Sequence, residues 1–222
     1  SSGISAAVNV TGGTLQIGTG GSINGGTLLT LGSGTSSGLL VLGDSSSAVN
    51  QTFVNLATSG TGTANAIVGG SSGISVLTAN TTTTETYAGS IGGTGTNQNN
   101  IALVKAGTQT LTLSGNNTYT GGTTISGGVL TLGSAGALGT SGNITFTGGF
   151  LRFSASNLVD YGSRIKNSTS AVSLSAFGNT VTFNSAIDSS NTAGLTFANN
   201  GTFILNGANT YSGTTTVDAG TL

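Results

Sequence analysis

The segment Leu103–Gly133 reads LVKAGTQTLTLSGNNTYTGGTTISGGVLTLG and contains the clearest structural signals of the chain. Leu111 and Leu113 alternate with threonines, and Leu130 and Leu132 repeat this arrangement after a glycine-rich segment. Alternation of apolar and polar residues with a period of two is typical of β-strands with one buried face. The glycines between the apolar stretches favour tight turns. The segment therefore predicts short strands joined by turns, and helix signals are nearly missing from the whole chain.

Much of this segment recurs later in the chain. Leu103–Leu130 aligns without gaps on Leu195–Leu222, at an offset of 92 residues, with 13 of 28 positions identical. Self-similarity at a fixed offset indicates a solenoid, in which each repeat buries its apolar residues against its neighbours. With roughly 20–25 residues per rung, we expect an all-β solenoid of roughly nine to eleven rungs. It would form a single domain over residues 1–222, with repeat copies near 103–133 and 195–222.

The composition excludes several classes of protein. Only 35% of the 222 residues are hydrophobic and 4% are charged, but the net charge is −1 and the 40 glycines punctuate regular apolar stretches. This favours an ordered core with an uncharged polar surface over a disordered chain. Cys, His, Met and Trp are all absent, which excludes disulfides and sites for soft metals. Four basic residues are too few for a nucleic-acid interface, and no apolar run is long enough to insert into a membrane.

The segment Leu103–Gly133 closely resembles the passenger-associated repeat of bacterial autotransporters, above all in its NTY-TGGTT core. The second copy resembles the repeat more loosely and has Phe197 where the first has Lys105. The two copies cover about a quarter of the chain. The resemblance implies a right-handed parallel β-helix on the bacterial cell surface, exported through the outer membrane. In that family the repeat accompanies transport and folding of the passenger, and it defines no ligand or activity.

Two pairs of matching residues are candidates for structural positions in turns or ladders. Asn117 matches Asn209, and Tyr119 matches Tyr211. Asparagine tolerates the left-handed backbone region and bonds neighbouring backbone groups, so we expect a structural role for these residues. Contact with a ligand is the functional alternative.

The densest polar cluster, Asp160–Lys166, is the best candidate for a surface interaction site. Asp160, Tyr161, Arg164 and Lys166 could bind a sugar or an acidic partner. The alternative is a loop that protrudes from the rod and carries a local ion pair, since ion pairs on protein surfaces are common and contribute little.

No catalytic, cofactor-binding or metal-binding residue is expected, and the chain is predicted not to be an enzyme. The five acids are spread along the sequence, whereas glycoside hydrolysis needs two carboxyl groups that face each other. No histidine can activate a serine or threonine. A divergent polysaccharide-degrading β-helix enzyme is the less favoured alternative. Threonine ladders are also found on ice-binding solenoids, but Arg152 and Ser173 interrupt the ladder in this sequence.

These observations favour an extracellular structural protein. Neither end of the sequence carries a capping signal, and uncapped solenoid ends present strand edges that can pair. We expect either a subunit that stacks head to tail into a fibre or stalk, or a segment of a long surface rod. The alternative is an adhesin passenger that binds surface glycans or proteins through loops such as 58–73 or 160–166. The expected location is extracellular or on the bacterial surface, with end-to-end self-association as the expected partnership.

Overall fold

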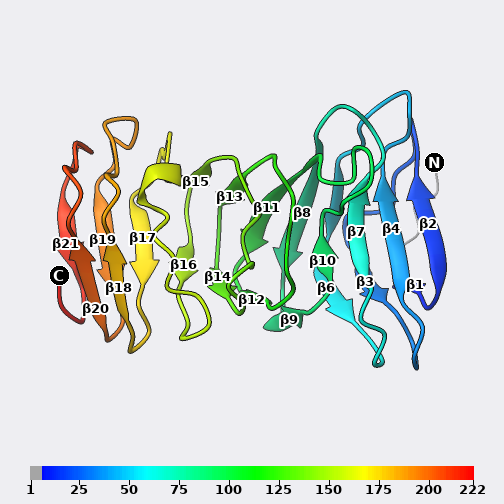
Figure 1. Cartoon of the computed structure of the whole chain (residues 1–222), viewed down its shortest axis with the longest axis horizontal. Helices are drawn as coiled ribbons and strands as arrows, with labels where there is room; N and C mark the ends of the chain where they lie inside the picture. Colours follow the sequence, from blue (N-terminus) through cyan, green and yellow to red (C-terminus); the bar gives the residue numbers. More distant parts are fainter. Residues whose placement is uncertain (1–6) are drawn as a thin grey trace.

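A computed structural model describes residues 7–222, so residues 1–6 of the expected single domain lie outside the described part. The chain winds into a rod of stacked coils, with its two ends at opposite ends of the rod (Figure 1). The strands of successive coils pair in parallel in every sheet (Figure 1). The solenoid has about nine coils, and the predicted parallel β-helix is confirmed.

The strands of residues 7–222 form five parallel sheets, and within each sheet the strands follow one another in chain order. The first sheet holds β1 (Val8–Val10), β3 (Leu28–Leu31) and β6 (Asn55–Thr58). The second holds β2 (Gly13–Ile17), β4 (Gly38–Leu42), β7 (Ala66–Gly69) and β10 (Ser90–Ile91). The third holds β5 (Gln51–Phe53), β8 (Ser75–Thr81), β11 (Ile101–Gly107), β13 (Thr123–Ile125) and β15 (Ile144–Phe146).

The remaining two sheets include the C-terminal coils. A seven-stranded sheet holds β9 (Glu85–Tyr87), β12 (Thr110–Leu113), β14 (Val129–Leu132), β16 (Phe150–Arg152), β17 (Val172–Ser175), β19 (Leu195–Ala198) and β21 (Thr215–Val217). A two-stranded sheet pairs β18 (Thr180–Phe183) with β20 (Thr202–Leu205). One short 3₁₀-helix, η1, spans Gly162–Arg164.

The strand registers give the length of each coil. The shortest step is 19 residues, from Thr110 to its partner Val129. The longest is 27 residues, as from Leu28 to Asn55. The range brackets the expected rung length. The variation means that the neighbour of a residue in the next coil lies at no constant spacing in the sequence.

Stacked apolar side chains fill the interior. In the seven-stranded sheet one inward position is apolar in six successive coils, and register pairs join Leu111, Leu130, Leu151, Leu174, Phe197 and Val217 in that order. The first five of these side chains are buried. Burial of such a side chain contributes about 1.5–3 kcal/mol. A slim rod with 35% hydrophobic residues is therefore held together by its core.

The arrangement of the sheets changes in the coil that contains η1. Ile165 forms only an isolated bridge with Ile144, and the third sheet ends there. Beyond this coil, β19 of the second repeat lies in the seven-stranded sheet, although its counterpart β11 in the first repeat lies in the third sheet. The two repeat copies therefore have similar sequences, but their corresponding strands lie in different sheets.

Glycine is required where adjacent coils approach closely at a turn. Gly92 has a φ of +93°, and a Cβ built on it would lie 2.6 Å from the backbone nitrogen of Tyr119 in the next coil. A side chain at this position would force the two coils apart.

Candidate interaction site

The Asp160–Lys166 segment lies against the rod, so the alternative of a protruding loop with a local ion pair is wrong. Tyr161 is buried, packs 6.2 Å from the ring of Phe153 and bonds Asn157 through its hydroxyl. Ile165 is fully buried. The apolar residues within the segment hold it down, because they add to the core of this coil. The charged residues of the segment bond adjacent coils instead of one another.

Asp160 bonds the backbone of the following coil. Its Oδ2 accepts hydrogen bonds from the backbone nitrogens of Asn184 and Ser185 and from the Ser185 hydroxyl, each at 2.7 Å. Its Oδ1 accepts one from the Gly162 nitrogen at 2.9 Å. Burial acts to raise the pKa of Asp160, but these hydrogen bonds outweigh it and lower the pKa. Asp160 is therefore an ionised acceptor at neutral pH.

Arg164 bonds the preceding coil. Its guanidinium donates to the carbonyl oxygens of Gly139, Ser141 and Gly142 at 2.8–3.0 Å. The guanidinium carbon also lies 5.7 Å from the centre of the Tyr161 ring. These contacts use one N–H group of each guanidinium nitrogen.

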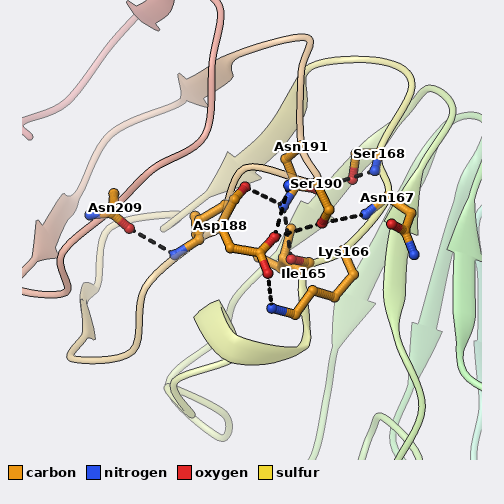
Figure 2. Close-up of polar contacts among 9 residues, drawn as sticks. Ile165, Lys166, Asn167, Ser168, Asp188, Ser190, Asn191 and Asn209 are labelled. Carbon is orange, nitrogen blue, oxygen red and sulfur yellow. Dashed lines mark hydrogen bonds and ion pairs between the residues drawn. The ribbon is translucent and has the colours of Figure 1, made fainter.

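Lys166 forms an ion pair with Asp188, 22 residues further along the chain (Figure 2). Asp188 also accepts hydrogen bonds from the backbone nitrogen and hydroxyl of Ser190. The bond from Lys166, followed by those from Ser190, lowers the pKa of Asp188 from 3.8 to about 2. The Ser190 hydroxyl in turn accepts a hydrogen bond from the backbone nitrogen of Asn167 at 3.0 Å. Figure 2 shows these contacts as one network between two coils.

Asparagine side chains extend this network. Asn191 accepts from the backbone nitrogen of Ser168 at 3.2 Å and donates to the carbonyl oxygen of Ile165 at 2.9 Å (Figure 2). Asn209 accepts from the backbone nitrogen of Ile187 at 2.8 Å. Its repeat counterpart Asn117 accepts from the backbone nitrogen of Ile91 at 2.7 Å. The two equivalent asparagines therefore bond an equivalent group of the preceding coil.

The paired tyrosines also lie in equivalent surroundings. The Tyr119 hydroxyl lies 2.7 Å from the Thr123 hydroxyl, and the Tyr211 hydroxyl lies 2.6 Å from that of Thr215. Tyr119 is fully buried, whereas Tyr211 is partly buried. Both side chains pack against the core within their own turn.

Three more charged residues contact adjacent coils, and the sequence did not single them out for this. Asp44 accepts from the nitrogen and hydroxyl of Thr19, which lower its pKa from 3.8 to about 2. Glu85 accepts from the backbone nitrogen of Leu56, and burial raises its pKa. Lys105 is buried and donates to the carbonyl oxygen of Gly127 at 3.0 Å.

The surface of residues 7–222 includes two shallow hollows. One, of about 250 Å³, lies along 58–65 and Ala88, within the 58–73 region predicted as a binding loop. The other, of about 330 Å³, lies between the outer face of the second sheet and the turn that begins at Gly92. Among residues 7–222, no three acids lie close enough together to hold a metal ion.

The passenger-associated-transport-repeat family matches residues 103–132 and 195–222, the two copies found in the sequence. No curated protein and no solved structure matches the chain. No helix within residues 7–222 is long and apolar enough to span a bilayer. Passenger repeats imply a secreted or cell-surface segment. The chain is a β-helix that carries two passenger-associated-transport-repeats, and in this it is similar to the passenger domains of autotransporters.

Proposed function

We propose that the chain is a non-enzymatic structural segment of an extracellular or cell-surface rod. The observation that carries this proposal is the use of charged side chains between coils. Asp44, Glu85, Asp160, Arg164 and the Lys166–Asp188 pair each bond a neighbouring coil. Because most charged side chains bond the protein's own backbone, few of them remain to bind or transform a substrate.

The acids are poorly suited to hydrolysis. Retaining and inverting glycosidases need one carboxyl group with a raised pKa opposite a second carboxylate. Asp44, Asp160 and Asp188 have lowered pKa values because they accept several hydrogen bonds. Glu85 has a raised pKa, but its carboxylate accepts bonds from Leu56 and Thr83. These features support a structural role over an enzymatic one.

End-to-end association is part of the proposal. β21 is the outermost strand of its sheet, and Val217 on it is 44% exposed. Val217 occupies the same inward position as the stacked residues of the preceding coils, which are Leu111, Leu130, Leu151, Leu174 and Phe197. A further parallel strand, from a second copy or from further coils of a longer chain, would cover this side chain and pair with this edge.

Negative-stain electron microscopy across a concentration series tests the association. We expect filaments of uniform width that lengthen with concentration. A Val217→Lys variant should stop their growth, because it places a charge where the next core residue would stack. A Ser163→Lys variant adds the same charge away from the edge and should leave filaments intact. Isolated short rods at every concentration would refute self-association. The proposal would then be that the chain is a segment of a longer rod.

A second candidate function is adhesion to surface glycans. One observation favours it: Arg152 lies against the exposed ring of Phe177, and its buried Nε has no hydrogen-bond acceptor within residues 7–222.

A further inference from the structure

Arg152 differs from the other three cations of the chain. Lys105 donates to three carbonyl oxygens, Arg164 donates to three more, and Lys166 pairs with Asp188. Arg152 forms no hydrogen bond within residues 7–222, and its buried Nε has no partner. Its one specific contact is with an aromatic ring, since the guanidinium carbon lies 4.7 Å from the centre of Phe177.

A second buried polar atom without a partner lies beside it. Arg152 on β16 is the register partner of Thr131 on β14. The Thr131 hydroxyl is buried and has no hydrogen-bond partner within residues 7–222. Buried polar atoms without partners are rare in native proteins, and each needs an explanation. Both atoms are closed to solvent, so they mark a place where the protein leaves its own polar groups next to the Arg152 guanidinium without partners.

Phe177 is held at the surface in an unfavourable backbone conformation. Its side chain is 55% exposed and its φ is +49°, a region that bulky residues rarely adopt. Phe177 lies three residues before β18, and Asn199 lies three residues before the paired strand β20 with a φ of +63°. Asparagine suits this conformation. The coil with Phe177 therefore accepts backbone strain and presents an aromatic ring to solvent.

We propose that Arg152 and Phe177 bind a carboxylated sugar of an acidic polysaccharide. The guanidinium fork matches the two oxygens of a carboxylate. The exposed ring offers an apolar surface for the face of the sugar. This inference goes beyond the structural role and does not depend on end-to-end association.

The surroundings favour a sugar over an acidic peptide. β16 pairs with β14 and β17, and β17 pairs with β16 and β19. Neither strand has a free edge to which a peptide strand could add, so peptide binding by β-augmentation is excluded at this site. No carboxylate of residues 7–222 pairs with Arg152, and Asp160 is bonded to Ser185. The guanidinium is thus left for an external anion.

Isothermal titration calorimetry with oligogalacturonate tests the proposal. The methyl ester of oligogalacturonate, which lacks the negative charge, is the neutral control. We expect the wild-type chain to bind oligogalacturonate, and to bind the ester at least tenfold more weakly. R152Q should lose at least tenfold in affinity for oligogalacturonate. R152K should lose part of the affinity, because an ammonium cannot form the bidentate contact. F177N removes the ring and places at this position the residue type found at Asn199, so it should weaken binding while the melting temperature is retained.

A matched control separates specific binding from a general charge effect. Ile74→Glu lowers the net charge by one, as R152Q does, at a 51% exposed position. Ile74 precedes β8, which lies three coils before β15. This variant should bind as the wild type does. Wild-type binding that is absent, equal for the ester, or equally lost in Ile74→Glu would overturn the proposal. Equal affinity for poly-glutamate would overturn the assignment to a sugar.

Discussion

Lys166 and Asp188 form an ion pair across two successive coils, although 22 residues separate them in the sequence. Their side chains are 28% and 38% exposed. The pair acts together with Ser190 and Asn191, which bond the backbone around Lys166. A contact of this kind can form only when the second coil is in place on the first.

Replacement of Asp188 should destabilise the rod in a pH-dependent way. The folded-state pKa of Asp188 is about 2, below its ordinary value of 3.8. The stabilisation is therefore present above pH 3.8 and is lost as the pH falls through 2. We expect Asp188→Asn to lower the midpoint of urea denaturation at pH 6 and to match the wild type at pH 2. A difference that stays constant between these pH values would contradict the assigned role.

Arg164→Gln should be more damaging than Arg152→Gln. Arg164 donates three hydrogen bonds to the preceding coil, and hydrogen bonds to charged groups are worth about 1.5–3 kcal/mol each. Glutamine retains at most part of them, so we expect a loss of about 2 kcal/mol. Arg152→Gln breaks no hydrogen bond and removes only the cation–π contact with Phe177, so it should cost at most about 1 kcal/mol. Chemical denaturation of both variants checks the ranking, and an equal loss would refute it.

Lys105 should make stability rise with pH in the alkaline range. Burial lowers the pKa of Lys105 from 10.5 to about 8. Between these values the unfolded chain binds more protons than the folded one, so stability increases from pH 8 to 10.5. We expect Lys105→Met to lose this increase relative to the wild type. Melting temperatures of both proteins at pH 7 and 9.5 measure it, with Arg152→Gln as a control that should keep the wild-type slope.

Asn117→Ala should cost more than Asn209→Ala, although the two residues occupy equivalent repeat positions. Asn117 is buried and also donates to the carbonyl oxygen of Ala137 in the next coil. Asn209 is only partly buried, and its amide donates to Gly207 within its own turn. We expect a loss of about 1–3 kcal/mol for Asn117→Ala and a smaller loss for Asn209→Ala. Equilibrium denaturation that reverses this order would show that the coil-to-coil bond is unimportant.

The coils could be predicted from the sequence because strand alternation and glycine turns are local signals. Leu111 and Leu113 mark the inward face of one strand, and Leu130 marks the next strand of the same sheet. The partners of the charged residues could not be predicted, since the coil length varies from 19 to 27 residues. No fixed spacing leads from Lys166 to Asp188 or from Asp160 to Ser185. Arg152 stood out in the sequence only as an interruption of a threonine ladder, because its contact with Phe177 depends on the turn after β17.

The short register steps between coils have a kinetic consequence. Paired residues lie 19 to 27 positions apart in a chain of 222, so the relative contact order of the strand pairs is roughly 0.1. That value is characteristic of helical bundles, although the strand pairings within residues 7–222 join different coils. Parallel sheets usually fold slowly because their strands are distant in sequence. In this chain each strand meets a partner only one coil away, so the rod should fold coil by coil and at a rate set by local loop closure.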